Sequence, residues 1–167
     1  MDKFVVRNAK REDCVEIRRL IQELADFEKM PDSVKLGAET LEKDGFDNPQ
    51  PPYQCIVAED PENPNKLIGY ALFFLGYATW NGKRVYLDDI MVSEKYRRSG
   101  VGSQLFSRVC EECVKQNCKV LNFVVLDWNP AQEFYKKIGA EDLTNKEGWH
   151  FFCLNESKIK EMAKLKT

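Results

Sequence analysis

SEKYRRSGVGSQLF, residues 93–106, decides the fold class of this chain. Arg97 and Arg98 precede glycines at 100 and 102, and apolar residues at helical spacing follow. Glycine lets a ligand approach the unpaired amides of a helix N-terminus, and the arginines add positive charge. Taken alone, this pattern also fits a tight turn with a structural cap. The alternative is a strand followed by a cradle for a phosphate or diphosphate and then a helix.

Length, composition and charge limit the classes of protein to which this chain can belong. The chain has 167 residues, of which 43% are hydrophobic, and this predicts one domain over residues 1–167. A net charge of −2 disfavours nucleic acid as a partner and is compatible with a cationic small molecule. No apolar run reaches membrane-spanning length, and the N-terminus lacks the apolar core of a signal peptide. We therefore expect a cytoplasmic protein without membrane association.

Six cysteines are present, and three of them, Cys110, Cys113 and Cys118, cluster in the sequence. A zinc site is one interpretation, but there is no second Cys-x-x-Cys motif and the single histidine, His150, is remote. Cys110 and Cys113 also lie at helical spacing among apolar residues, where buried cysteine acts as a small hydrophobic residue. The sequence therefore predicts reduced cysteines and no metal.

The strand signals predict a mostly antiparallel sheet. Three β-like runs are separated by turn-forming linkers at 60–65 and 78–82, which is typical of a meander. The run VLNFVVLDW is almost continuously apolar and predicts a strand buried on both faces. The expected strands are 3–7, 53–59, 66–77, 83–92, 120–128 and one near 148–154.

Helices are expected on the faces of this sheet, over 11–29, 38–44, 100–116, a short stretch after Asn129, and from about 156. The short helix has Asn129 as its N-cap, Pro130 at the first helical position and Gln132 at the third, and Gly139 ends it. This order of elements predicts an α+β fold.

Two motifs in combination resemble the signatures of the GNAT acyltransferases. Arg97 to Gly102 forms R-x-x-G-x-G between a strand and a helix, and Asn129 is followed by Tyr135 and Gly139. Further stretches, spread over essentially the whole chain, resemble the diamine acetyltransferase branch, and within it the thialysine N-epsilon-acetyltransferases, relatives of the spermidine/spermine acetyltransferases. These stretches are ELADFEKM (23–30), YLDDIMV (86–92), VLDWN (125–129), FYKKIGAEDLT (134–144) and EGWHFF (147–152).

The resemblance implies a single-domain GNAT fold, in which helices flank a mixed, mostly antiparallel sheet. It also implies transfer of an acetyl group from acetyl-CoA to a primary amine. The residues that it assigns to acetyl-CoA binding are Ile90, Met91, Val92, Arg97, Arg98, Ser99, Gly100, Val101, Gly102, Ser103, Asn122, Phe123, Val124, Asn129, Pro130, Ala131 and Gln132.

Two positions depart from the family pattern. Asn129 lies six residues before Tyr135, where the family usually has seven. Arg98 stands where glycine is common after the first arginine of the motif. Its side chain either adds a phosphate contact or points to solvent.

The reaction needs a group that takes a proton from the amine, and carboxylates are the candidates. They are Glu28, Asp88 and Asp89. Strict alternation puts Asp88 on the face of Tyr86 and Ile90, and Asp89 on the face of Leu87 and Met91. The resemblance assigns amine binding to Asp88, Glu28 and Phe27; the alternative is a solvated strand edge and an ordinary helix charge.

Tyr135 is the residue that the resemblance assigns to catalysis, as the donor to the leaving thiolate; the alternative is a core aromatic. The thioester oxygen is expected to accept from a backbone N–H near Met91. The resemblance implies thialysine and related aminoethyl amino acids as substrates, then polyamines or lysine. It also implies a homodimer, with Trp149 to Phe152 and the C-terminal helix at the contact. A protein lysine or N-terminal acetyltransferase and a non-catalytic CoA-binding protein are the competing functions.

Overall fold

The computed structural model describes residues 4–164, which form two compact units. The first unit ends at Val124 and the second begins at Val125. All of the strands lie in the first unit. They are β1 (Val5–Asn8), β2 (Gln54–Asp60), β3 (Asn63–Ala78), β4 (Gly82–Val92) and β5 (Val120–Asn122).

The five strands form one open sheet in the order of the sequence. Each of the first three strands pairs antiparallel with the next, and β5 pairs parallel with β4. The expected α+β class with a mixed, mostly antiparallel sheet is confirmed. β3 begins at Asn63, so the linker expected over 60–65 is largely strand.

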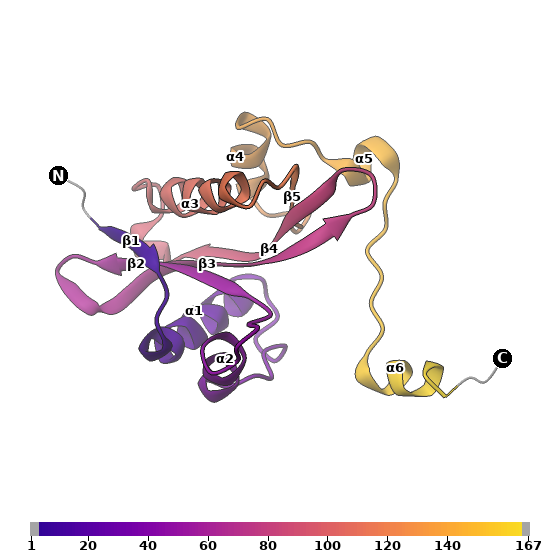
Figure 1. Cartoon of the computed structure of the whole chain (residues 1–167). Coiled ribbons are helices and arrows are strands. Elements are labelled where there is room, and N and C mark those ends of the chain that lie inside the picture. The colour runs from indigo at the N-terminus through magenta and orange to yellow at the C-terminus, as the bar shows by residue number, and fades with distance from the viewer. Residues whose placement is uncertain (1–3, 165–167) are drawn as a thin grey trace. The chain divides into compact units, whose positions relative to one another are not determined.

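Helices cover both faces of the sheet (Figure 1). α1 (Cys14–Phe27) and α2 (Ala38–Gly45) lie on one face, and α3 (Val101–Lys115) lies on the other. A 3-10 turn at Arg11–Asp13 replaces the expected first residues of α1. No helix in the described part of the chain has both the length and the apolar character that a membrane crossing requires.

Each face of the sheet has its own hydrophobic core. Apolar side chains spaced three or four residues apart along α1 and α3 supply the helical side of each core, as their periodicity predicts. The core under α3 includes Ile56, Phe73, Val85, Leu87, Val101, Leu105 and Val109. The core under α1 and α2 includes Cys14, Ile17, Leu20, Leu41, Val57, Tyr70 and Met91.

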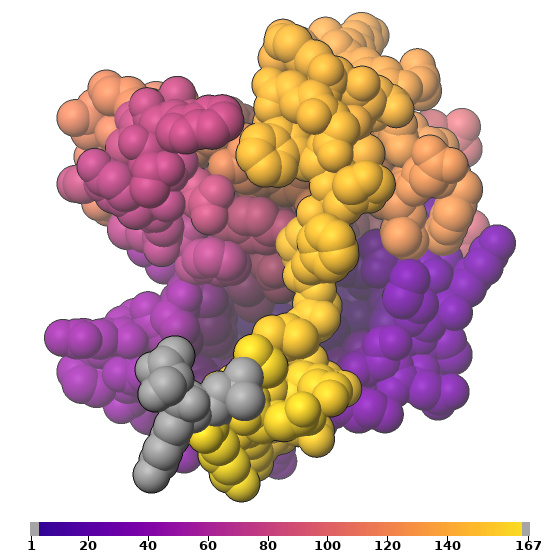
Figure 2. Space-filling model, turned by 90° about the vertical axis from the view of Figure 1, so that its right-hand side faces the viewer, coloured from indigo at the N-terminus to yellow at the C-terminus, as the bar shows by residue number. Residues whose placement is uncertain are grey.

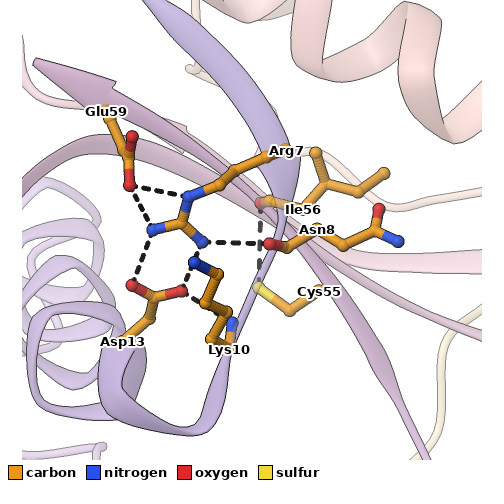
Figure 3. A network of polar contacts seen from close by, with 7 residues as sticks. All are labelled: Arg7, Asn8, Lys10, Asp13, Cys55, Ile56 and Glu59. Atoms are coloured by element: carbon orange, nitrogen blue, oxygen red, sulfur yellow. Dashed lines mark hydrogen bonds and ion pairs between the residues drawn. The ribbon is translucent and has the colours of Figure 1, made fainter. Parts of the chain in front are cut away.

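A polar network fastens the edge strand β1 to its surroundings (Figure 3). Arg7 Nε donates to Glu59 Oε1 at 2.6 Å, and Arg7 Nη1 donates to Asp13 Oδ2 at 2.7 Å. Burial alone would raise the pKa of Asp13, but hydrogen bonds from Arg7 and the Lys10 amide hold it below its usual value. The network ties β1 to β2 and to the start of α1.

The expected strand over 120–128 is wrong beyond its first residues. β5 ends at Asn122, and Val124 is 59% exposed. β5 pairs only with Arg84 to Tyr86 of β4, and a strand cannot continue where no partner satisfies its amides and carbonyls. An apolar run by itself does not reveal where its partner strand diverges.

The second unit contains three short helices. They are α4 (Ala131–Lys137), α5 (Leu143–Glu147) and α6 (Glu156–Met162). The strand expected near 148–154 is wrong, because this stretch is irregular and exposed. Figure 2 shows it as a narrow column of side chains between the bulkier α5 and α6. Among residues 4–164, no strand pairs with it.

Candidate active site

The turn that connects β4 to α3 is anchored from two sides. Ser93 Oγ donates to Glu23 Oε2 of α1 at 2.9 Å. Tyr96 Oη donates to Asp60 Oδ2 at 2.6 Å, and Asp60 is only 8% exposed. Sequence analysis did not single out Tyr96 or Asp60, because a contact between residues 36 positions apart leaves no local signal. These anchors set the path of the chain immediately before the glycine-rich segment.

The backbone of the glycine-rich segment turns through left-handed conformations. Arg98 has φ of 61° and Gly100 has φ of 93°. Glycine adopts such angles without steric cost, so Gly100 is explained by the turn itself. Left-handed residues at a helix start direct successive amides into one concave region, which suits an anion.

The amides of residues 98–103 are available to a ligand. The first backbone hydrogen bond of α3 is donated by the Gln104 N–H to the Gly100 carbonyl oxygen, at 3.1 Å. Within residues 4–164, the six amides before Gln104 donate to no acceptor. Six open donors at the N-terminus of a 15-residue helix, next to Arg97 and Arg98, form an anion cradle.

Gly102 is not required by the fold. A Cβ atom added to it would meet only Val92 Cγ2, at 3.6 Å, which is ordinary van der Waals contact. Glycine within a helix costs about 1 kcal/mol relative to alanine. Packing therefore gives no reason for glycine here, whereas close approach of a ligand to the backbone does.

One edge of β4 is open next to this cradle. β4 continues to Val92, but its pairing with β5 ends at Tyr86. Among the described residues, no strand pairs with that edge from Leu87 to Val92. An extended ligand can add to such an edge through backbone hydrogen bonds.

Strand alternation identifies the amides on this open edge. Ser93 N–H donates to Ile68 O of β3, at 2.9 Å. Amides two residues apart on a strand point the same way, so the Met91 amide faces β3, and those of Ile90 and Val92 face the open edge. The donors open to a thioester oxygen near Met91 are therefore those of Ile90 and Val92.

A β-bulge at Asp88 interrupts β4. Leu87 pairs with Phe73 and Asp89 pairs with Leu72, so Asp88 has no counterpart on β3. Beyond the bulge the alternation shifts, and Ile90 packs in the same core as Leu87. The expected grouping of Leu87 with Met91 is therefore wrong, whereas Asp89 and Met91 lie on the face of Tyr70, as expected of that pair. Bulges of this kind redirect side chains near active sites.

Asp88, Asp89 and Glu28 form an acidic group. Tyr70 Oη donates to Asp89 Oδ2 at 2.9 Å. Burial, and to a lesser degree the charges of Asp88 and Glu28, raise the pKa of Asp89 to about 6. Burial also raises the pKa of Glu28. Asp88 is exposed as a whole residue, but partial desolvation of its carboxyl group raises the pKa of that group as well. Three carboxyl groups with raised pKa values favour a cationic ligand.

Asp89 is the member of this group that sequence analysis named only as a candidate base. Its partner Tyr70 was not singled out at all. The only sequence signal for this site is the pair Asp88-Asp89 within a β-like run. Strand alternation does not locate the bulge at Asp88, so it does not predict the bond from Tyr70 to Asp89.

Phe27 lies against Arg97. The Arg97 guanidinium is 4.4 Å from the centre of the Phe27 ring, and Arg97 Nε donates to Val92 O at 3.0 Å. The structure therefore brings a residue expected at the amine site into contact with one expected at the acetyl-CoA site.

Three expected cofactor residues lie around the end of β5. Asn122 is its last residue, and Asn122 Oδ1 accepts from Arg84 Nη1 at 3.5 Å. The Phe123 ring packs edge-on against Phe106 of α3, with 5.9 Å between ring centres, and Val124 is exposed. The Phe123 side chain therefore packs at the edge of the core under α3.

In the second unit, α4 begins one residue later than expected, so Asn129 lies one residue before the N-cap position. Its Oδ1 accepts from the Ala131 amide at 2.9 Å, while Pro130 occupies the N-cap position and the helix begins at Ala131. This is the local bond that asparagine makes before a turn. Gln132 Nε2 donates to the carbonyls of Leu126 and Asp127, and so closes the loop before α4.

Tyr135 lies on α4, whose last residue is Lys137, and the expected glycine of its C-terminal cap, Gly139, follows two residues later. Gly139 has φ of 92°, and the Ala140 amide donates to the Tyr135 carbonyl at 3.0 Å in a Schellman cap. Burial raises the pKa of the Tyr135 phenol to about 12. The phenol therefore keeps its proton through neutral and moderately alkaline pH.

The cysteine cluster has a structural explanation. The Cys118 amide donates to the Cys113 carbonyl at 2.8 Å, in the cap that ends α3. Cys113 and Cys118 both pack at the edge of the core under α3. Within residues 4–164, no three His, Cys, Asp or Glu side chains are grouped so as to hold a metal ion.

Comparison with known proteins agrees with this geometry. The open mixed sheet, in which β4 leads into α3 through a glycine-rich turn, is the fold of a family of acyltransferases. The sequence profile of the acetyltransferase (GNAT) family matches residues 16–140, and the chain belongs to this family of acyltransferase enzymes.

Relatives are similar over nearly the whole chain. The thialysine N-epsilon-acetyltransferase of Bos taurus is 43% identical over 95% of this chain and 96% of its own length. The spermidine/spermine N(1)-acetyltransferase-like protein 1 of Homo sapiens is 40% identical over 98% of this chain, which spans 24% of that longer protein. An integron cassette protein from the mobile metagenome of V. cholerae has the same fold, with a TM-score of 0.76, 19% identity and coverage of 99% of this chain and 100% of its own.

Proposed function

We propose that this protein transfers an acetyl group from acetyl-CoA to a primary amine of a small molecule, with thialysine and related aminoethyl amino acids as the best substrates. The observation that carries the proposal is the run of open amides from Arg98 to Ser103 beside the open edge of β4. Family membership supports acetyl-CoA as the co-substrate, because GNAT acetyltransferases use it.

The residues of the first unit fit this co-substrate. The open amides and Arg97 hold the diphosphate, and the edge at Ile90 to Val92 pairs with the extended pantetheine chain. When bound, acetyl-CoA supplies an acetyl group activated as a thioester. The other proposed contacts are the remaining cradle residues, the end of β5 and the loop from Asn129 to Gln132.

The acidic group binds the amine and takes its proton. A lysine-like amine with a pKa near 10.4 lies about 4 kcal/mol from its reactive neutral form at pH 7.4. Glu28 and Asp88 hold the ammonium form by charge. Asp89, with a pKa of about 6, is ionised at that pH and accepts the proton directly or through water.

Tyr135 acts as the proton donor to the leaving thiolate. With its pKa near 12, the phenol acts first as a hydrogen-bond donor to the developing negative charge, and proton transfer follows as the thiolate is desolvated.

The substrate class follows from the relatives and from the acidic group. Relatives named as thialysine N-epsilon-acetyltransferases are similar over nearly their whole length. A relative named for spermidine and spermine supports polyamines as further substrates. Each of these substrates is a cation, which the three carboxyl groups favour.

A panel of acceptors tests the proposal. Acetyl-CoA turnover is measured with thialysine, spermidine, lysine and a histone-like peptide at equal concentrations. We expect kcat/KM to be highest for thialysine. Preference for the peptide would support a protein acetyltransferase instead, and CoA binding without turnover of any acceptor would support a non-catalytic protein.

We further propose that residues 1–167 act as one acetyltransferase domain, because the family match at 16–140 extends across the junction at Val124 and Val125. We also propose a cytoplasmic homodimer. Exposed aromatic residues support the dimer: Trp149 is 54% exposed, Phe151 81% and Phe152 88%. The six cysteines, all unpaired, support a reducing compartment.

A further inference from the structure

The ring of Phe27 and the guanidinium of Arg97 form a cation–π contact. Phe27 is the last residue of α1, and Arg97 begins the glycine-rich segment 70 positions later. The distance of 4.4 Å from Arg97 Cζ to the ring centre is well within the range of such contacts. Tertiary structure alone brings these two residues together.

The guanidinium is held on two sides before any ligand binds. The Phe27 ring covers one face, and Nε donates to the Val92 carbonyl at 3.0 Å. No carboxylate within residues 4–164 forms an ion pair with Arg97. The two Nη groups can therefore donate to an anion. Because the Arg97 side chain is already ordered, binding of the anion costs less side-chain entropy.

The same contact restricts the role that the family resemblance implies for Phe27. A cationic amine cannot stack on the ring face that the guanidinium covers, and the two positive charges would repel each other. A ring that contacts Arg97 acts on the anion cradle.

We propose that Phe27 is a positioning residue, which orients Arg97 toward the diphosphate of CoA. This inference rests on the proposed function. It assigns Phe27 to the binding of the nucleotide carrier.

Calorimetric binding of CoA to four variants tests the inference. Phe27→Leu removes the ring, Phe27→Tyr retains it, Arg97→Lys keeps the charge but removes the planar group, and the double variant completes a cycle. We expect Phe27→Leu to raise the Kd for CoA about 3- to 30-fold, the range that a cation–π contact supplies. Phe27→Tyr should bind like the wild type, and Phe27→Leu should have little further effect in the Arg97→Lys background.

Kinetics provide a second readout. S-acetylpantetheine lacks the diphosphate, so Phe27→Leu should reduce kcat/KM for acetyl-CoA but not for S-acetylpantetheine, and it should leave the KM for the amine unchanged. Thermal melting of each variant reports whether it is folded, and Phe27→Tyr preserves the packing if the leucine variant does not fold.

Separate outcomes distinguish the two levels of the proposal. If the wild type does not bind CoA, the proposed function fails and this inference fails with it. If the wild type binds CoA and Phe27→Leu binds it equally well, or loses as much affinity in the Arg97→Lys background, only the positioning role is overturned. A rise in the KM for the amine alone would return Phe27 to the amine site.

Discussion

At the scale of single residues, the bulge at Asp88 matters most for the chemistry. It leaves Asp89 bonded to Tyr70 within reach of the charges of Asp88 and Glu28. Because its pKa is raised, ionised Asp89 destabilises the folded protein, and the same group has a proposed role in proton transfer.

The stability of the protein should depend on the protonation of Asp89. Its folded-state pKa of about 6 lies above the ordinary value of 3.8, so the folded chain holds this proton more tightly than the unfolded chain. Stability is therefore lost as pH rises from about 4 to above 6, by up to about 3 kcal/mol. Asp89→Asn retains an acceptor for Tyr70 and should raise the free energy of unfolding at pH 8 while removing this pH dependence.

Urea denaturation of wild type and Asp89→Asn at pH 4.5 and pH 8 measures this effect. The same variant should lose turnover, and kcat/KM of the wild type should rise with pH through about 6. Equal destabilisation of Asp89→Asn at both pH values would contradict the burial of this charge.

Tyr135 is the second residue on which the proposed mechanism depends. Tyr135→Phe removes the hydroxyl group and keeps the ring, so kcat should fall about 10²- to 10⁴-fold while the Kd for CoA changes little. With its pKa near 12, Tyr135 should cause no loss of activity up to about pH 10. Steady-state assays over pH 6–10 measure both effects, and an unimpaired Tyr135→Phe enzyme would remove this residue from the mechanism.

At the scale of elements, the two glycines at the N-terminus of α3 are present for different reasons: backbone conformation at Gly100 and access of a ligand at Gly102. Gly100 serves the turn, because its φ is positive, whereas Gly102 has space for a side chain in the folded protein. Stability and ligand binding should therefore respond in opposite directions when Gly102 is replaced.

Gly102→Ala should stabilise the protein by up to about 1 kcal/mol, because alanine is the better helix former. It should also weaken CoA binding at least about tenfold, because the new methyl group occupies the approach to the amides. Ser107→Ala, an exposed position on the same helix, is the matched control and should bind CoA normally. Thermal melting and calorimetry measure the two effects, and unchanged affinity in Gly102→Ala would refute the cradle.

The elements also differ in how well local sequence predicts them. The start of α3 and the end of α4 follow from glycines at positions where the backbone is left-handed, and both were correctly predicted. The end of β5 and the irregular stretch at 148–154 were not. Whether an apolar run becomes a strand depends on a partner with free amides and carbonyls, and that partner is not encoded nearby.

At the scale of the whole molecule, the exposed aromatic stretch bears on assembly. A chain that leaves Phe151 and Phe152 more than 80% exposed lowers its free energy by covering them. If the proposed homodimer forms through this stretch, replacing both with serine should shift the mass in light scattering from dimer to monomer. Trp80→Ser is the control, since Trp80 is 81% exposed in the first unit and should not change the mass. Monomerisation by the control alone would place the interface elsewhere.

The sequence by itself determined the fold class, the family and the position of the cradle, because each depends on local spacing: glycines, arginines and periodic apolar residues within a few positions of one another. Only the tertiary structure decided the bulge at Asp88, the bond from Tyr70 to Asp89, the contact of Phe27 with Arg97 and the short β5. Each of these joins residues distant in the chain, or depends on where two strands diverge, and such packing leaves no periodic signal in either segment.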